Sequence, residues 1–323
     1  MIRPAFAAFA AALVPLLPAE AGQLSKVWVA NAGADGAGCG SLAAPCRTLQ
    51  QAHDNVAAGG EVGVLTPGEY GRAGPISLLI SKSIGITNNG AGEASLASQN
   101  TGIEIVAGAG DVIGLRGLVV DGQGGGGGGI FLARASAVHI QRCIVRNFEG
   151  LGGAFAIVVT AEATLQLFVS DTLIYNNGNT AQSGGVWLSP GNANVVLDHV
   201  HLENNVRGLW VTGLNAGGAP GGRVVLRNSV VAGNAGNGIL AETNADGAPV
   251  LIAVEDSVIV NNGGDGIRAD GPGATILLDD NTVARNAAGI SAANRGQLIS
   301  YGNNRINNNL GSDGAPTGRL GPL

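Results

Sequence analysis

Charged residues recur at one position of a glycine-initiated segment that is repeated along the chain. Glu242 lies four residues after Gly238, and Asp270 lies four residues after Gly266, with Arg268 two residues before it. If these segments are parallel strands of one sheet, Glu242 and Asp270 point to the same face on neighbouring strands, about 4.8 Å apart. Carboxylates this close can act as the acid and the nucleophile of a retaining glycosidase, or hold a Ca²⁺ ion that bridges to substrate uronates. Arg268 can bind a substrate carboxylate, whereas an ordinary solvated salt-bridge cluster is the alternative for all three side chains.

Aromatic side chains occupy the same predicted face. In each segment, the residue after the glycine is expected to point inward and the next one outward. The outward column is then Phe131, Val158, Trp187, Trp210, Leu240, Arg268 and Ser291. Exposed aromatic patches mark binding surfaces, and flat amphipathic rings suit the apolar faces of sugars. We therefore predict that Phe131, Trp187 and Trp210 bind a carbohydrate. The alternative is that a loop, 178–183 or 214–222, covers the rings as a small second core.

A longer repeat, ending in asparagine, contains these segments. Alternating apolar residues precede each asparagine, and a turn and a glycine-initiated segment follow it, which favours strands over helices. The asparagines are Asn177, Asn205, Asn234, Asn262, Asn286 and Asn308, with Asn147 ending an earlier copy that is shifted by one position. A unit this short cannot bury its apolar face alone, so the copies are expected to stack as parallel strands with the asparagines in ladders. A second column, expected at bends, contains Asp171, His199, Asn228, Asp256 and Asp280.

Residues 45–56 have apolar side chains at helical spacing, which predicts a helix that covers the first coil of the stack. Around it lie Ala-Pro-Cys-Arg-Thr-Leu at 44–49, Gly-Gly-Glu-Val-Gly-Val at 59–64 and Pro-Gly-Glu-Tyr at 67–70, preceded by Asp35-Gly36. These segments resemble the N-terminal cap and first coil of secreted proteins of the pectin-lyase-like superfamily. The resemblance implies an all-β, right-handed parallel β-helix with a short N-terminal capping helix.

The resemblance is specific for fold and says little about activity, because the superfamily includes lyases, glycosidases, epimerases, tailspikes and non-catalytic surface proteins. In the lyases that it resembles, an acid-bound Ca²⁺ ion and a basic residue perform β-elimination, so the resemblance implies that Arg268 is a base or a clamp. The Asn-Thr-Asp and Gly-His-Gly signatures of polygalacturonase-like glycosidases are absent from the sequence, as is the Asp-Pro-His motif of epimerase-like members.

The first 21 residues contain a basic start, an apolar run and small residues at a plausible cleavage point, which predicts a signal peptide. We expect an N-terminal cap over 22–60, the parallel β-helix over 61–310 and a C-terminal tail over 311–323. A secreted or periplasmic location is oxidising, so Cys39 and Cys46 are expected to form a disulfide, with Cys143 left in the core. No later segment is apolar enough to span a membrane.

Composition narrows the classes of partner. The net charge of −6 leaves no basic stripe, which argues against nucleic acid. His199, His201 and Glu203 are close in sequence, but adjacent strand positions alternate between faces, so we do not expect a metal there. Oligomeric state and the natural polymer are not encoded in any recognisable motif.

The sequence therefore supports two hypotheses. The first is a secreted β-helix protein that binds a polysaccharide along the Trp187 and Trp210 face, with cleavage by Glu242, Asp270 and Arg268 as its extension. The second is a non-catalytic surface or periplasmic protein in which the solenoid acts as a scaffold or adhesion rod.

Overall fold

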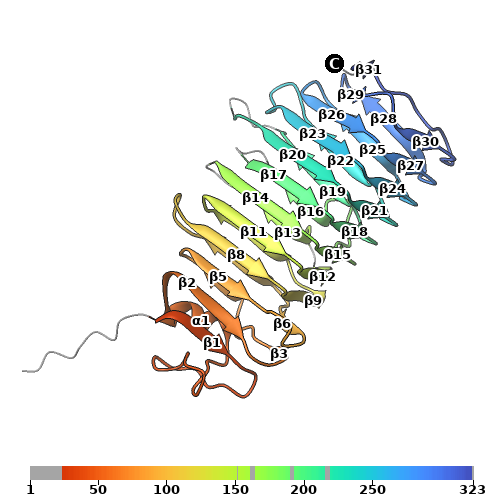
Figure 1. The fold of residues 1–323 in the computed structure, drawn as a ribbon. Coiled ribbons are helices and arrows are strands. Elements are labelled where there is room, and N and C mark those ends of the chain that lie inside the picture. The colour runs from red at the N-terminus through yellow and green to blue at the C-terminus, as the bar shows by residue number, and fades with distance from the viewer. Residues whose placement is uncertain (1–23, 151, 161–163, 190–192, 215–218, 322–323) are drawn as a thin grey trace, which may run out of the picture.

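The computed structural model describes residues 24–150, 152–160, 164–189, 193–214 and 219–321. The predicted signal peptide, 1–21, lies outside this part of the chain. The described residues form an elongated solenoid of parallel strands, with the N-terminal elements at one end and the C-terminal strands at the other (Figure 1). Between Val56 and Asn307, the chain adds strands to three parallel sheets in turn, which confirms the predicted parallel β-helix.

The strands are assigned to the sheets as follows. Sheet A contains β1 (Leu24–Val29), β2 (Val56–Val64), β5 (Ile84–Thr87), β8 (Val112–Arg116), β11 (Ala137–Gln141), β14 (Leu165–Ser170), β17 (Ala193–Asp198), β20 (Gly222–Arg227), β23 (Val250–Glu255), β26 (Ala274–Asp279), β29 (Gln297–Ser300) and β31 (Gly318–Arg319). Sheet B contains β3 (Gly68–Glu69), β6 (Ala94–Ala97), β9 (Val119–Gly125), β12 (Ile144–Phe148), β15 (Leu173–Tyr175), β18 (His201–Glu203), β21 (Val230–Ala232), β24 (Val258–Val260), β27 (Thr282–Ala284) and β30 (Arg305–Asn307). Sheet C contains β4 (Ile76–Ile80), β7 (Thr101–Val106), β10 (Gly128–Arg134), β13 (Phe155–Val159), β16 (Gly184–Leu188), β19 (Leu209–Thr212), β22 (Ile239–Glu242), β25 (Asp265–Asp270) and β28 (Ala288–Ala293).

The core fills the space that the three sheets enclose. Inward positions of successive strands carry aliphatic residues in register, as in the column of Val195, Val224, Ile252 and Ile276 in sheet A. β-Branched side chains fit this pleated, densely packed interior. Their alternation with polar outward residues fixes the strand register, because a slip by one residue would turn every apolar side chain to solvent.

The bend between sheets A and B has the predicted residues in the left-handed conformation. The φ values of Asp171, His199, Asn228, Asp256 and Asp280 lie between 46° and 52°. Asn and Asp tolerate this region better than most residues, and they occupy four of these five bends, with His199 at the fifth. The prediction that this column lies at bends is confirmed.

The asparagine ladder lies at the end of sheet B and is buried. The side-chain amide of Asn234 donates to Oδ1 of Asn262 at 2.9 Å, and Asn262 donates to Oδ1 of Asn286 at 2.8 Å. The next member is Asn309, to which Asn286 donates at 3.0 Å, whereas Asn308 occupies the left-handed bend before it with φ of 57°. The prediction of Asn308 as a ladder residue was therefore wrong by one position.

The earliest predicted copy is also shifted, as expected. Asn147 has a left-handed φ of 59°, and Phe148 occupies the ladder position, where its backbone N–H donates to Oδ1 of Asn177. A phenyl ring has no amide to continue the ladder, so the chain of asparagine side chains begins at Asn177.

The capping helix α1 (Leu49–Asn55) is shorter than the predicted 45–56 and begins after Thr48, whose side chain accepts a hydrogen bond from Gln51 N. Cys46 instead pairs with Val29 as a parallel bridge, which keeps the segment before Thr48 extended. α1 packs against β1, β2 and β4, so it covers the first coil.

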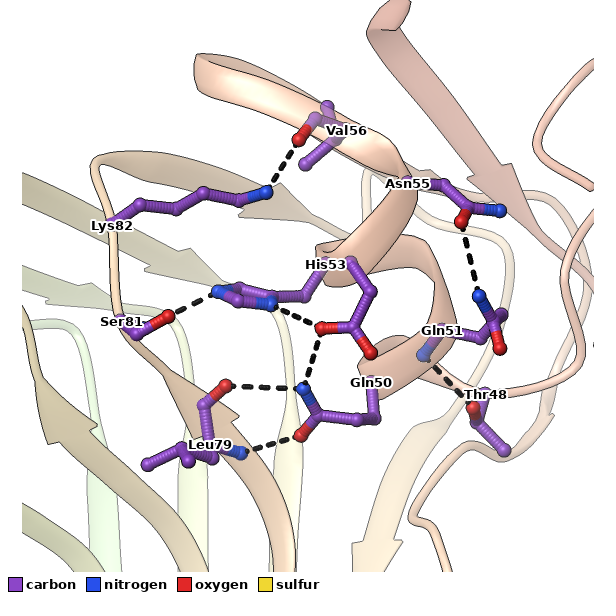
Figure 2. A network of polar contacts seen from close by, with 10 residues as sticks. Thr48, Gln50, Gln51, His53, Asn55, Val56, Leu79, Ser81 and Lys82 are labelled. Carbon is purple, nitrogen blue, oxygen red and sulfur yellow. Dashed lines mark hydrogen bonds and ion pairs between the residues drawn. The ribbon is translucent and has the colours of Figure 1, made fainter. Parts of the chain in front are cut away.

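Polar contacts fasten α1 to the following chain (Figure 2). Gln50 Oε1 accepts from Leu79 N at 2.8 Å, and Nε2 of His53 accepts from Ser81 N at 3.3 Å. Beside the helix, Cys39 and Cys46 are joined in a disulfide, and Cys143 is a buried free thiol. These contacts close the N-terminal end of the solenoid.

Sheet A extends into both predicted end segments, because β1 pairs with β2 and β31 pairs with β29. Backbone groups of Ser312 and Asp313 accept hydrogen bonds from β28, so the tail forms part of a last coil. No helix in the described ranges is long and apolar enough to cross a membrane.

Candidate functional site

The outer face of sheet C carries the predicted column in register. Parallel pairing of β10, β13, β16, β19, β22, β25 and β28 aligns Phe131, Val158, Trp187, Trp210, Leu240, Arg268 and Ser291. The predicted alignment of this column is therefore confirmed. The sequence pattern does not distinguish the side chains of this column, but they differ in their exposure to solvent. This difference determines what the face can bind.

Three aromatic rings form the centre of a second hydrophobic cluster, separate from the main core. The ring centroid of Trp187 lies 5.4 Å from that of Phe155 and 5.8 Å from that of Trp210. Phe155 and Trp210 are 6.0 Å apart. Val158 and Leu240 complete the buried part of the cluster. Stacked rings at these separations are favourable and hold one another in fixed orientations.

The rings differ in their access to solvent. Trp210 is only 9% exposed and Phe155 only 2%, whereas Trp187 and Phe131 are partly exposed at the rim of the cluster. The expectation that Trp210 forms an exposed platform is wrong, because Phe155 and Arg207 pack on it. The alternative of a small second core is correct for Trp210. The alternative named two loops as possible covers, 178–183 and 214–222, and residues 215–218 of the second lie outside the described part of the chain.

Polar atoms surround Trp210. Its Nε1 donates to Oε2 of Glu242 at 3.0 Å, and Cζ of Arg207 lies 4.3 Å from its ring centroid. Burial lowers the pKa of the Arg207 guanidinium, and the charge of Glu242 opposes this shift. Among the described residues, neither Nη1 of Arg207 nor Nε1 of Trp187 has a hydrogen-bond partner, and both atoms are buried.

The predicted charged residues lie beside the aromatic cluster. Glu242 and Asp270 are register partners on β22 and β25, as expected. Arg268 donates from Nη2 to Oδ2 of Asp270 at 2.9 Å and from Nη1 to Oδ2 of Asp265 at 3.2 Å. Asn294 donates to Oδ1 of Asp270 at 2.7 Å. The structure thus brings Glu242, Arg268 and Asp270 together, with both oxygens of Asp270 occupied.

These contacts favour the charged forms of Asp270 and Arg268. Burial disfavours the ionised form of Asp270, but hydrogen bonds from Arg268 and Asn294 outweigh it and lower the carboxyl pKa. The hydrogen bond to Asp270 raises the pKa of Arg268, and the bond to Asp265 adds to this effect against burial. Asp270 is therefore a poor general acid and Arg268 a poor general base. The cluster can accept hydrogen bonds from hydroxyl groups and can offer a guanidinium edge.

The alternative of a Ca²⁺ ion held by Glu242 and Asp270 does not fit this cluster. A calcium site needs six to eight oxygen ligands, whereas the Asp270 oxygens are taken by a guanidinium and an amide. The described residues contain no group of three or more His, Cys, Asp or Glu side chains placed to hold a metal.

The histidines of β18 and its preceding bend have separate partners. Nδ1 of His199 lies 2.9 Å from Oδ1 of Asp198, and Nδ1 of His201 lies 2.7 Å from Oε1 of Glu203. This agrees with the expectation that the two rings do not converge.

Four residues of the site were missed in the sequence: Phe155, Arg207, Asp265 and Asn294. Two of them carried a usable signal. Phe155 replaces the glycine that Gly128 and Gly184 supply at the same register position, and Arg207 directly precedes the repeated Gly208. Asp265 and Asn294 could not be identified from the sequence, because they belong to the site only through their contacts with Arg268 and Asp270.

A surface pocket adjoins the charged cluster at the corner between sheets C and A. Asn294, which bonds Asp270, lines this pocket together with Thr243, Pro272 and Arg295. The aromatic rim and the charged cluster therefore follow one another along the solenoid axis, and the pocket lies beside the charged cluster, at the ends of β22, β25 and β28.

Comparison with known proteins supports the fold. A family model described as "Right handed beta helix region" matches residues 217–310. The pectate lyase Pel9A is a similar solved structure, with a TM-score of 0.61, 15% identity, and coverage of 86% of this chain and 75% of that one. The A-module of mannuronan C-5 epimerase AlgE4 from Azotobacter vinelandii has a TM-score of 0.49 and 17% identity, covering 82% of this chain and 91% of its own. No curated protein sequence matches the chain.

Proposed function

We propose that this chain, which has a parallel β-helix fold, is an exported carbohydrate-binding protein that holds a polysaccharide along the outer face of sheet C. Pel9A, which shares the fold, is a pectate lyase. The observation that carries the proposal is the partly exposed ring of Trp187, fixed between Phe155 and Trp210.

A fixed aromatic ring is a suitable support for a sugar. The stacking partners hold Trp187 in one orientation, so little conformational entropy is lost when a ligand binds to its accessible part. Its flat apolar surface matches the C–H face of a pyranose. Phe131, two strands away in the same outward column, supplies a second partly exposed ring.

The charged cluster continues this surface. From Phe131 to Arg268 the column crosses five strand spacings, about 24 Å at about 4.8 Å each. Glu242 and Asp265 can accept hydrogen bonds from sugar hydroxyls along the second half of that length. A face this long favours an extended polymer over a single sugar.

The proposal is binding without cleavage. A glycosidase needs one protonated carboxyl with a raised pKa. The lowered pKa of Asp270 does not suit it to this role, and Oε2 of Glu242 is engaged by the N–H of Trp210. β-Elimination needs a base, and ion pairing raises the pKa of Arg268. The same contacts that keep these groups charged suit them to recognition.

Export is part of the proposal. The Cys39–Cys46 disulfide supports it, because such bonds persist in oxidising compartments. A secreted or periplasmic location also gives access to extracellular polysaccharides.

Binding to a panel of neutral and uronate-rich polysaccharides tests the proposal. We expect Trp187→Ala to weaken binding about tenfold or more, since stacked rings are typical binding hot spots. The matched control is Phe168→Ala, because Phe168 is a partly exposed aromatic residue on sheet A that stacks on His139. New reducing ends or unsaturated products would overturn the non-catalytic assignment. Equal effects of the two substitutions, or no binding to any polymer, would overturn the site.

A further inference from the structure

The outer face of sheet A carries a continuous apolar column. Sheet A runs along the solenoid, and its strands β14, β17, β20, β23, β26 and β29 are consecutive neighbours (Figure 1). Their central outward positions hold Phe168, Val196, Val225, Ala253, Leu277 and Ile299, all of them partly exposed. The outward positions of a solvated sheet are normally polar, whereas this column contains no polar or charged side chain. A contiguous exposed apolar surface of this kind marks an interaction site.

Polar side chains flank the apolar column on both sides. Towards the start of the strands the outward residues are Gln166, Asn194, Arg223, Thr275 and Gln297, with Leu251 as the exception, and towards the end they are Ser170, Asp198, Arg227, Glu255 and Asp279. An apolar centre inside a polar rim is the usual anatomy of a protein–protein interface.

The apolar column has a protruding ring and a hollow, three strands apart. Phe168 is its one aromatic member, and the ring stacks on His139 at a centroid distance of 4.9 Å. Ala253 is its smallest member, and it lines a groove of about 280 Å³ together with Val225 and Leu251. A ring that is already held in one orientation loses little conformational entropy when it is buried. Phe168 is therefore suited to fill a hollow like the one at Ala253.

We propose that a second copy of this chain docks on the outer face of sheet A. The dimer has a two-fold axis in the plane of the interface, parallel to the strands and midway between β17 and β20. This axis places β14 of one copy against β23 of the other, so each Phe168 enters the groove at the partner's Ala253. At the centre of the contact, Val196 on β17 faces Val225 on β20 of the partner.

The rest of the face fits this arrangement. The same axis sets Asp198 opposite Arg227, which already bond to each other within one copy at 2.9 Å, so the four groups alternate in charge. Ile299 on β29 faces Gly114 on β8, which has no side chain and has open space where a Cβ would lie. A two-fold axis along the solenoid would instead set Arg223 opposite Arg227 on the same strand, and like charges disfavour that contact.

The face has the size of an ordinary interface. From β8 to β29 it crosses seven strand spacings, which is about 34 Å at about 4.8 Å each, and five residues along each strand span about 17 Å. The projected area is then about 580 Å², and the solvent-accessible area exceeds the projection because side chains protrude. A standard protein–protein interface buries about 800 Å² on each partner.

Sedimentation velocity on the full chain at micromolar concentration tests the dimer. We expect the unaltered chain to sediment as a dimer. Val196→Asp and Val225→Arg should each weaken it about tenfold or more, because each places an unpaired charge at the centre of the contact. The matched control is Val230→Asp, since Val230 is a partly exposed valine on the outer face of sheet B.

Mixing the two variants tests the position of the axis. Because Val196 of one copy meets Val225 of the other, a mixture of Val196→Asp and Val225→Arg chains forms a heterodimer with one Asp–Arg pair and one Val–Val pair. We expect the mixture to recover dimers that neither variant forms alone. With the axis along the solenoid, each position would face itself and mixing would recover nothing.

Each other outcome contradicts a stated part of the proposal. A monomeric unaltered chain, or a dimer that neither substitution weakens, would overturn docking on sheet A. Dimers that both substitutions abolish and that mixing does not restore would overturn the axis. A monomer that binds vesicles of phosphatidylcholine and phosphatidylglycerol, with binding lost in Val196→Asp, would assign the face to a lipid surface instead.

A third substitution covers charged variants that fold poorly. Phe168→Ala adds no charge and removes the ring that enters the groove, so it should weaken the dimer. Because association stabilises the folded state, the melting temperature of the unaltered chain should rise with protein concentration, and that of Phe168→Ala should rise less. Sheet C lies outside this contact, so the affinity of each copy for a carbohydrate should stay unchanged. Equal concentration dependence in the two proteins would count against the role of Phe168.

Discussion

The indole Nε1 of Trp210 donates a hydrogen bond of 3.0 Å to Oε2 of Glu242 on the neighbouring strand. This bond joins the aromatic cluster to the charged cluster of sheet C. Because Trp210 is only 9% exposed, its N–H has little access to water as an alternative partner. Glu242 is thus both part of the proposed binding face and a structural acceptor.

Removing that acceptor should destabilise the protein. We expect Glu242→Ala to lower the free energy of unfolding by about 1–3 kcal/mol, the usual penalty for a buried donor left unpaired. Glu242→Gln keeps an acceptor, and should stay within about 0.5 kcal/mol of the unaltered chain. Thermal unfolding of both variants is the measurement. Equal losses would mean that the negative charge, and not the hydrogen bond, is what stabilises Trp210.

The asparagine ladder makes a larger contribution at each position. Asn234 Oδ1 accepts from Asn205 N at 3.0 Å, and its Nδ2 donates to Leu202 O at 3.0 Å. Leucine is similar in size but can make neither bond. Asn234→Leu should therefore cost about 3 kcal/mol or more, since two buried backbone groups lose their partners.

The control for the ladder uses the same substitution on an exposed position. Asn194 is exposed on β17, and Asn194→Leu should leave the melting temperature nearly unchanged. If Asn234→Leu melts like this control, the ladder is not a source of stability.

The fold and the register of the sheet C column were predictable because local sequence periodicity determines both. Alternation with period two sets which residues face inward, and the spacing of residues such as Asn234 and Asn262 sets the length of each turn. Exposure within the column was not predictable. It depends on Phe155, which takes a position that glycine occupies in the neighbouring strands, and on Arg207, which lies outside the strand.

Two smaller errors have the same kind of cause. The helix was predicted to begin at Pro45, but the disulfide and the pairing of Cys46 with Val29 hold that segment extended until Thr48. The last ladder residue was misplaced by one, because Asn308 and Asn309 are identical in type and only backbone geometry assigns the bend to Asn308. Contacts between residues far apart in the sequence determine both the start of the helix and the last ladder residue. The local sequence pattern does not contain this information.

The Cys39–Cys46 disulfide should stabilise the N-terminal cap. The sulfurs close a loop with a sequence separation of 7, and Asn55 of α1 donates to Cys39 O at 3.0 Å. Closing a loop of this length lowers the conformational entropy of the unfolded chain, which stabilises the folded protein by about 2.5 kcal/mol. We expect the double substitution to serine, or addition of reductant, to lower the melting temperature.

Cys143 provides the internal control for reduction. Burial raises the pKa of its thiol to about 11, so a thiol reagent at neutral pH should not label the folded protein. Labelling of Cys143 before the cap disulfide is reduced would show that the solenoid interior opens first, against this prediction.

The cap should also lose stability in mild acid through His53. Its Nε2 accepts from Ser81 N at 3.3 Å, and its Nδ1 lies 2.9 Å from Oδ1 of Asp54 (Figure 2). Protonation would place a hydrogen on Nε2, facing another donor. Burial lowers the pKa of His53 below 6.5, aided by the charges of Lys82 and Arg72, although Asp54 opposes the shift.

Proton linkage determines whether His53 stabilises the cap more at high or at low pH. The unfolded chain takes up the proton at a higher pH than the folded chain, so the contribution of His53 is complete above pH 6.5 and declines as pH falls below it. The carboxyl groups with lowered pKa values, such as Asp198 and Asp270, contribute losses only near or below their ordinary value of 3.8. We therefore expect the melting temperature to fall as the pH drops below 6.5, and His53→Gln to flatten this slope. Parallel slopes for the two proteins would exclude His53 as the titrating group.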